Sequence, residues 1–244
     1  MNPEWWRQAV IQLDEQVGGF TDKIRVKLKE LKPQELIIRK NPYLFCLRAT
    51  NDTRRYAESI LDAFLSSSEE TMFGTLAEDC AVIICNHGKH GWKSGAEGID
   101  IEYSDVEYLK SKTRTIVQVK SGKNWGNSSQ RKKMEDYFKK YAKILRQGGD
   151  INVRCIEGVC YGPASKNDRG NFHTYIGSEF WKEISGWDGI YLALLGVFRS
   201  HAQNGLSEVK ADAKECITNF LVKNAISVNG QINWDNLILY VNGK

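Results

Sequence analysis

Two short stretches, GIDIEY at Gly98–Tyr103 and TIVQVK at Thr115–Lys120, alternate apolar and polar residues as β-strands do. The alternation predicts that Gln118 and Lys120 share one face of the second strand, while the intervening valines are buried behind them. If the two strands are antiparallel neighbours, Asp100 on the first strand converges on that pair. We therefore expect an acid, an amide and a cation to meet on one sheet.

Helical patterns surround these strands, and a further strand follows them. The order helix, strand, strand, helix, strand predicts an α/β core around a mixed sheet flanked by helices. The polar stretch between the two strands suits a hairpin or a short extra strand. We expect helices at 4–17, 21–31 (closed by Pro33), 53–66, 68–86 and 129–147, and a strand at 153–161.

No repeat or Pro/Gly/Ser linker interrupts the 244 residues, so we expect a single domain over 1–244. Its core is expected at 51–187, with a helical N-terminal addition at 1–50 and a C-terminal addition at 188–244. Hydrophobic residues make up 41% and charged residues 26%, which excludes a disordered or fibrous chain.

Positive charge is concentrated in one segment of the chain. Between Lys110 and Arg154 there are 13 Lys and Arg residues against 3 acids, whereas the rest of the chain carries a net charge of −6. This asymmetry indicates one basic face on an acidic body, as in proteins that bind a polyanion. The alternative is a solvated basic helix without a partner.

The sequence also indicates the cellular location of the protein. No run of about 18 apolar residues occurs, so we expect no membrane span. The N-terminus lacks the pattern of a signal peptide, and the six cysteines are scattered along the chain. We therefore expect reduced thiols and a cytoplasmic location.

Glu78, in the helix FGTLAE that precedes the first strand, is a natural second carboxylate beside Asp100. Hydrolysis of a phosphodiester needs oxygen ligands for Mg²⁺ and a cation that orients water and offsets the developing negative charge. Glu78, Asp100, Gln118 and Lys120 supply these groups.

These residues together resemble the PD-(D/E)xK nuclease superfamily. Over roughly residues 40–187 the sequence is more specifically similar to type II restriction endonucleases of the PmeII-like kind. The resemblance rests on Glu78, GID at 98–100 and VQVKSG at 117–122, and on NPYLF at 41–45, SSEETMFG at 67–74, KSGKNWGNSSQ at 120–130 and FWKEISG at 180–186.

The resemblance implies a restriction-endonuclease-like fold and a role for each matching residue. It assigns the metal-binding acid to Asp100 and the lysine of the motif to Lys120. Gln118 stands where the family usually has an acid; its carbonyl still ligates Mg²⁺ but brings no charge. A helix carboxylate must then help to hold the ion (Mn²⁺ may substitute), with Glu78 as the first choice and Glu70 as the next.

The polar segment that follows Lys120 is the candidate DNA contact. Its side chains suit phosphates or base edges, and a helix that begins near Ser129 presents its N-terminus to a phosphate. The alternative is a capped loop before a helix. The candidate DNA-binding residues are Ser121, Lys123, Asn124, Asn127, Ser128, Ser129, Gln130, Arg131, Lys132 and Lys133.

We therefore expect a Mg²⁺-dependent type II restriction endonuclease that cuts double-stranded DNA at a specific sequence. Because a palindromic site is matched by two-fold symmetry, a homodimer is expected, with a monomer that cuts the two strands in sequence as the alternative. Two alternatives remain open: a structure-specific repair or junction nuclease with the same core, and a catalytically inactive DNA-binding module, which the neutral Gln118 favours.

Overall fold

The computed structural model describes residues 2–48, 50–104, 113–149, 152–202 and 206–243. It divides into two compact units, Met1–Gly19 with Phe73–Ala202 and Phe20–Met72 with Gln203–Lys244. Helices α1 (Trp6–Lys29) and α4 (Thr53–Lys89) contribute residues to both units. The single-domain organisation expected from the sequence stays a prediction.

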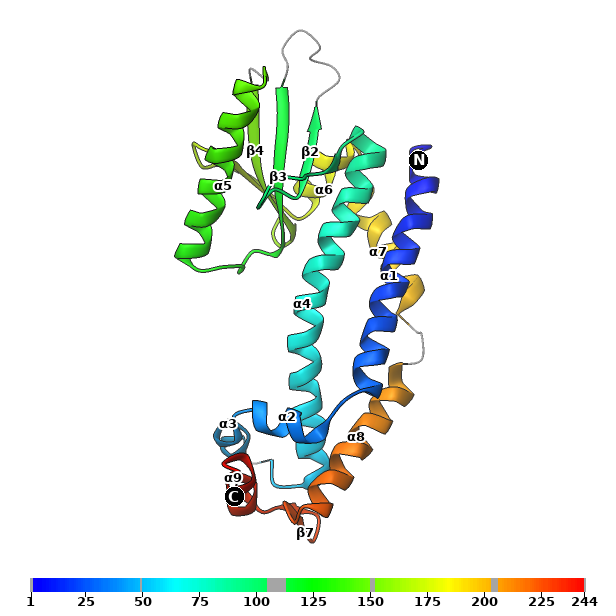
Figure 1. Ribbon diagram of the computed structural model, residues 1–244. Coiled ribbons are helices and arrows are strands. Elements are labelled where there is room, and N and C mark those ends of the chain that lie inside the picture. Colours follow the sequence, from blue (N-terminus) through cyan, green and yellow to red (C-terminus); the bar gives the residue numbers. More distant parts are fainter. Residues whose placement is uncertain (1, 49, 105–112, 150–151, 203–205, 244) are drawn as a thin grey trace. The chain divides into compact units, whose positions relative to one another are not determined.

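The unit that contains Asp100 is built on a mixed sheet, as predicted. Its described residues form six strands in the order β1-β2-β3-β4-β6-β5, part of which is visible in Figure 1. β2 pairs antiparallel with β1 and β3, β4 pairs parallel with β3 and β6, and β5 is antiparallel to β6. The strands are β1 (Trp92–Lys93), β2 (Ile101–Ser104), β3 (Thr113–Gly122), β4 (Asn152–Tyr161), β5 (Ser165–Asp168) and β6 (His173–Ile176).

Helices cover both faces of this sheet. Met134, Phe138 and Ala142, at four-residue spacing on α5 (Ser128–Gln147), pack in one cluster with Cys155 of β4. Gly158 lies three residues further along β4, so it faces the other side. There the ring of Phe180, on α6 (Ser178–Ser185), approaches so closely that a Cβ on Gly158 would lie 2.1 Å from it. α7 (Ile190–His201) packs against α6.

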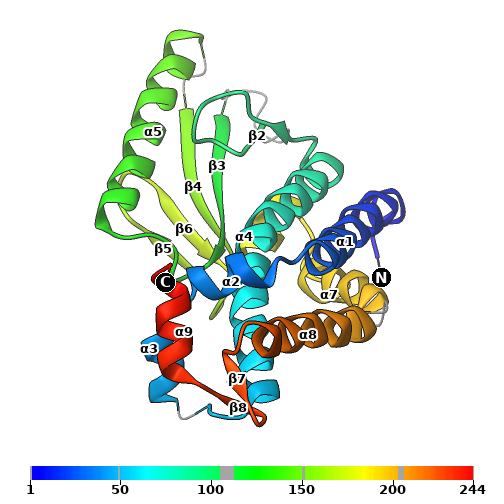
Figure 2. The same ribbon diagram turned by 60° about the horizontal axis from the view of Figure 1, so that its bottom comes forward.

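The other unit has its own apolar core. It contains α2 (Pro33–Arg39), α3 (Pro42–Leu47), α8 (Leu206–Lys223), α9 (Trp234–Val241) and the short strands β7 (Ser227–Val228) and β8 (Gln231–Ile232), as Figure 2 shows. The fully buried Tyr56, Ile60, Ile217 and Leu237 belong to its core.

Two helix breaks predicted from the sequence are wrong. The helices expected at 4–17 and 21–31 form the single helix α1, and those expected at 53–66 and 68–86 form the single helix α4. Polar residues inside α4 bond within it, since Ser67 Oγ donates to the carbonyl of Ala63 and Thr71 Oγ1 to that of Ser67. Glu70 therefore lies inside α4 and not in a first turn, and Pro33 begins α2.

The remaining predicted elements agree with the structure. The predicted strands appear as β2, β3 and β4, and the basic helix appears as α5. The hairpin or extra strand expected between β2 and β3 falls on residues 105–112, outside the described residues. No helix in the described part of the chain is long and apolar enough to cross a bilayer.

Candidate active site

Asp100 lies immediately before β2 and is fixed by the backbone of β3. The antiparallel pairing on which the expected convergence of Asp100 depends is present, with Ile101 opposite Val117. The amide of Asp100 donates to the carbonyl of Val117 at 2.9 Å, and the amide of Val119 donates to Asp100 Oδ2 at 2.6 Å. Asp100 thus bonds to the residues on either side of Gln118.

Charged side chains gather around Asp100. Burial is the largest influence on its carboxyl group and raises its pKa; the hydrogen bond from Val119 lowers it, and the negative charge of Glu78 raises it. The positive charges of Lys120 and Lys93 lower the same pKa. The structure therefore brings Glu78, Asp100 and Lys120 together, while their roles stay predictions.

Lys93, on the edge strand β1, joins this group although the sequence analysis did not select it. Its Nζ lies 3.3 Å from Glu78 Oε1 and 4.0 Å from Asp79 Oδ1. The hydrogen bond and the negative charge of Glu78 raise the pKa of Lys93. No local pattern marks this lysine, because only the pairing of β1 with β2 places it beside the acids.

Gln118 is buried in the sheet with only 4% of its surface exposed. Its Nε2 makes no hydrogen bond to any described residue. Its register partner on β4 is Glu157, which is 2% exposed. Partners in register on parallel strands share a face, so a neutral residue at 118 avoids placing two buried carboxylates side by side.

Glu157 and Trp125 form a support that the sequence analysis also missed. Trp125 Nε1 donates to Glu157 Oε1 at 2.6 Å, and Thr174 Oγ1 donates to Glu157 Oε2 at 2.7 Å. The Nζ of Lys120 lies 4.6 Å from the centroid of the Trp125 ring, and the guanidinium carbon of Arg131 lies 5.1 Å from it. The indole is therefore held by Glu157 and in turn holds Lys120 by a cation–π contact.

The donor set suits a hard divalent cation. Mg²⁺ prefers oxygen ligands and is usually held by one or two carboxylates, completed by water and substrate phosphate. Glu78 and Asp100 offer two carboxylates that repel each other, and the side-chain amide of Gln118 adds a neutral oxygen. The described residues contain no cluster of three or more His, Cys, Asp or Glu side chains suited to a metal. Glu70 belongs to the other unit, and its role as a ligand stays a prediction.

The segment after Lys120 is largely exposed and begins α5. Asn127 Oδ1 accepts from the amide of Gln130, and Gln130 Oε1 accepts from the amide of Asn127, which makes a capping box. The side-chain oxygens of Asn127 and Gln130 therefore cap the helix, as in the alternative of a capped loop. The exposed members of the predicted set are Lys123, Asn124, Asn127, Ser128, Ser129, Gln130, Arg131, Lys132 and Lys133, with Ser121 half-buried.

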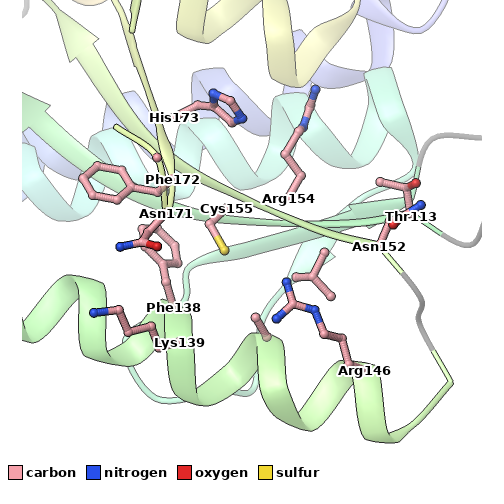
Figure 3. A pocket seen from close by; sticks show the side chains of 13 residues that line it. Thr113, Phe138, Lys139, Arg146, Asn152, Arg154, Cys155, Asn171, Phe172 and His173 are labelled. Carbon is pink, nitrogen blue, oxygen red and sulfur yellow. The ribbon is translucent and has the colours of Figure 1, made fainter. Parts of the chain in front are cut away.

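A pocket of about 390 Å³ lies between α5 and the sheet, and none of the predicted site residues lines it (Figure 3). Phe138 and Phe172 contribute apolar surface, and Lys139 and Arg146 extend from α5. The pocket includes Thr113 at the start of β3, about 23 Å along the strand from Lys120 at 3.3 Å per residue. The pocket and the candidate site are therefore formed by different residues.

The model of one protein family, the type II restriction endonuclease EcoO109I family, matches residues 8–205. The chain belongs to this family of restriction endonucleases, and a member of it is a nuclease that acts on DNA. No curated protein matches the chain. The resemblance to restriction endonucleases is thus confirmed, whereas the PmeII-like subgroup and the PD-(D/E)xK superfamily stay predictions.

The buried carboxylate of Glu157 gives a testable consequence for residue 118. We expect Gln118→Glu to destabilise the metal-free protein by about 2 kcal/mol, because like charges repel and burial disfavours a second carboxylate. The melting temperature then falls by roughly 4–8 °C. We expect Mg²⁺ to raise it more in the variant than in the wild type, measured by thermal melting with EDTA or Mg²⁺. Gln16→Glu, an exposed site on α1, is the control. Equal metal-free stability of Gln118→Glu and wild type would contradict the expectation.

Proposed function

We propose that the protein is a Mg²⁺-dependent restriction endonuclease that hydrolyses phosphodiester bonds of double-stranded DNA at a specific sequence. The observation that carries the proposal is the position of Asp100, bonded on both sides of Gln118, with Glu78 and Lys120 in electrostatic reach. The family supports action on DNA, and the PD-(D/E)xK assignment is part of the proposal.

Each side chain has a role in this proposal. The carboxylates of Glu78 and Asp100 and the amide oxygen of Gln118 hold the ion. When bound, Mg²⁺ (or Mn²⁺ in its place) supplies Lewis-acid stabilisation of the phosphoryl oxygens and activates water. Lys120 orients the attacking water and offsets negative charge as it develops. Trp125 fixes the position of Lys120.

The basic segment binds the DNA backbone in this proposal. Its cations are exposed on α5, a helix whose Met134, Phe138 and Ala142 are buried. Lys and Arg residues that neutralise phosphates release counterions, so affinity falls steeply as salt rises. A homodimer matching a palindromic site is part of the proposal. The exposed cations of α5 are Arg131, Lys132, Lys133, Lys139, Lys140, Lys143 and Arg146.

One observation favours a second candidate, a DNA-binding module without catalysis. Gln118 stands where the resemblance leads us to expect an acid, and its neutral amide lowers the negative charge available to a metal ion. A structure-specific repair or junction nuclease would use the same residues but recognise DNA shape.

Digestion of unmethylated phage DNA by the purified protein separates these functions. The restriction function predicts discrete fragments in Mg²⁺ and none in EDTA, and mapping the fragment ends gives the recognition sequence. A repair nuclease would instead cut branched or flapped DNA without fixed bands. An inactive module would only shift DNA in a gel. Absence of cleavage in Mg²⁺ and in Mn²⁺ with several DNAs would overturn the proposal.

A further inference from the structure

Lys93 is a second cation at the candidate site. It belongs to the two-residue strand β1, in register with Ile101 of β2, the residue after Asp100. The next amide, of Ser94, donates to the carbonyl of Asp100 at 3.0 Å. The backbone of Lys93 is therefore fixed beside the acids.

The turn that follows Lys93 is braced as well. Ser94 Oγ donates to the buried Glu102 and accepts from the amide of Ala96. Gly98 has a φ of +74° and lies against the ring of Tyr137, where a Cβ would be 2.3 Å away. Only a glycine fits this close left-handed turn. The turn after Lys93 is thus fixed, while the Lys93 side chain itself is largely exposed.

The ion pair between Lys93 and Glu78 is exposed enough for another ligand of Glu78 to replace Lys93. The Lys93 side chain is 61% exposed and that of Glu78 is 30% exposed. An ion pair so open to water contributes little to stability, so a stronger ligand readily displaces it. A divalent cation at Glu78 and Asp100 is such a ligand, since it neutralises both carboxylates and repels the ammonium group.

The same position leaves Lys93 near the substrate. A ligand oxygen lies about 2.1 Å from Mg²⁺, so any phosphate oxygen that shares the ion with Glu78 lies within about 4.2 Å of the Glu78 ligand oxygen. Lys93 Nζ is already 3.3 Å from Glu78 Oε1. The phosphate oxygen therefore lies at most about 7.5 Å from the present position of Nζ, a distance that rotation of the flexible lysine stem can cover.

We propose that Lys93 holds Glu78 in the metal-free protein and transfers to the scissile phosphate when a divalent cation binds. It therefore opposes metal binding and assists cleavage. The inference rests on the proposed function, because it takes Glu78 and Asp100 as metal ligands and DNA as the substrate.

Lys93→Met tests this exchange because it keeps most of the stem and removes the charge. Calorimetric titration of the DNA-free protein with Ca²⁺ is expected to show metal binding about two- to five-fold tighter than in the wild type. In saturating Mg²⁺ the single-turnover cleavage rate of DNA is expected to fall roughly 10- to 100-fold, since a charge-assisted contact to the phosphate is lost. These changes go in opposite directions, which a purely structural role does not produce.

Two controls give the test its specificity. Lys182→Met removes another lysine of the same unit that pairs with an exposed acid, Asp188; we expect neither quantity to change. In a Glu78→Gln background, Lys93→Met is expected to increase Ca²⁺ affinity less than it does beside the native Glu78, because the competition at Glu78 has been removed and only the effect of the Lys93 charge on Asp100 remains. Thermal melting checks that each variant is folded.

The outcomes distinguish failure of the Lys93 exchange from failure of the proposed nuclease function. If the wild type cleaves DNA but Lys93→Met binds Ca²⁺ no more tightly or cleaves at the wild-type rate, the exchange is wrong and the nuclease function stands. If the wild type cleaves no DNA, the proposed function fails. The calorimetric comparison then still decides whether Lys93 competes with a metal ion for Glu78.

Discussion

Replacement of Asp100 by asparagine is expected to lower the rate of DNA cleavage by roughly 100- to 1,000-fold. Asparagine keeps an oxygen that accepts the hydrogen bond from Val119, so the connection to β3 remains. It removes one of the two carboxylates proposed to hold Mg²⁺, and the neutral Gln118 cannot replace the lost charge. Single-turnover cleavage over a range of Mg²⁺ concentrations measures the loss.

The stability of Asp100→Asn separates loss of catalysis from loss of fold. Burial raises the folded-state pKa of Asp100, so ionising this group costs stability as pH rises from its unfolded pKa, near 4, through its folded pKa. In EDTA at neutral pH the variant is therefore expected to melt at or above the wild-type temperature, with the difference shrinking as the pH falls toward about 4. Asp212→Asn, an exposed site on α8, is the control.

Either of two results would contradict this prediction. Cleavage by Asp100→Asn at the wild-type rate in saturating Mg²⁺ would remove Asp100 from the proposed mechanism. A melting temperature well below that of the wild type would assign the lost activity to misfolding, and it would mean that Asp100 serves the sheet more than the reaction.

The sequence predicts the central part of the site because that part follows from local rules. Alternation along a strand places residues 118 and 120 on one face, and strong alternation on both sides of a polar stretch predicts the pairing of β2 with β3. Given that antiparallel pairing, Asp100 lies beside Gln118 in the register that the structure shows. The basic helix α5 follows in the same way from the spacing of Met134 and Phe138.

Site residues that are placed by the pairing of other strands could not be predicted from local sequence patterns. Glu157 becomes the neighbour of Gln118 only through the parallel register of β3 with β4, and Lys93 approaches Glu78 only because an edge strand of two residues pairs with β2. Trp125 lies in a polar loop, and its bond to Glu157 depends on the same register. The continuity of α4 was missed because serines suit the start of a helix, whereas here the Ser67 hydroxyl bonds back to the carbonyl of Ala63 and apolar residues of the helix pack into the core.

Lys120→Met is expected to produce a loss of cleavage as large as that of Asp100→Asn, roughly 100- to 1,000-fold, with little change in DNA affinity. The methionine keeps apolar contact with the Trp125 ring but loses the charge that faces Asp100 and the developing phosphoryl charge. DNA affinity measured in Ca²⁺ is expected to stay within about three-fold of the wild type, because many exposed cations of α5 share the phosphate contacts.

Lys123→Met, three residues along the chain, is the control for Lys120→Met. Lys123 is exposed and belongs to the predicted DNA-binding segment, so its loss is expected to weaken binding and reduce the salt dependence by about one phosphate contact. The single-turnover rate at saturating protein is expected to change little. If Lys120→Met instead weakened DNA binding and left the rate unchanged, Lys120 would be one more phosphate contact, and the inactive DNA-binding module would become the better account of this chain.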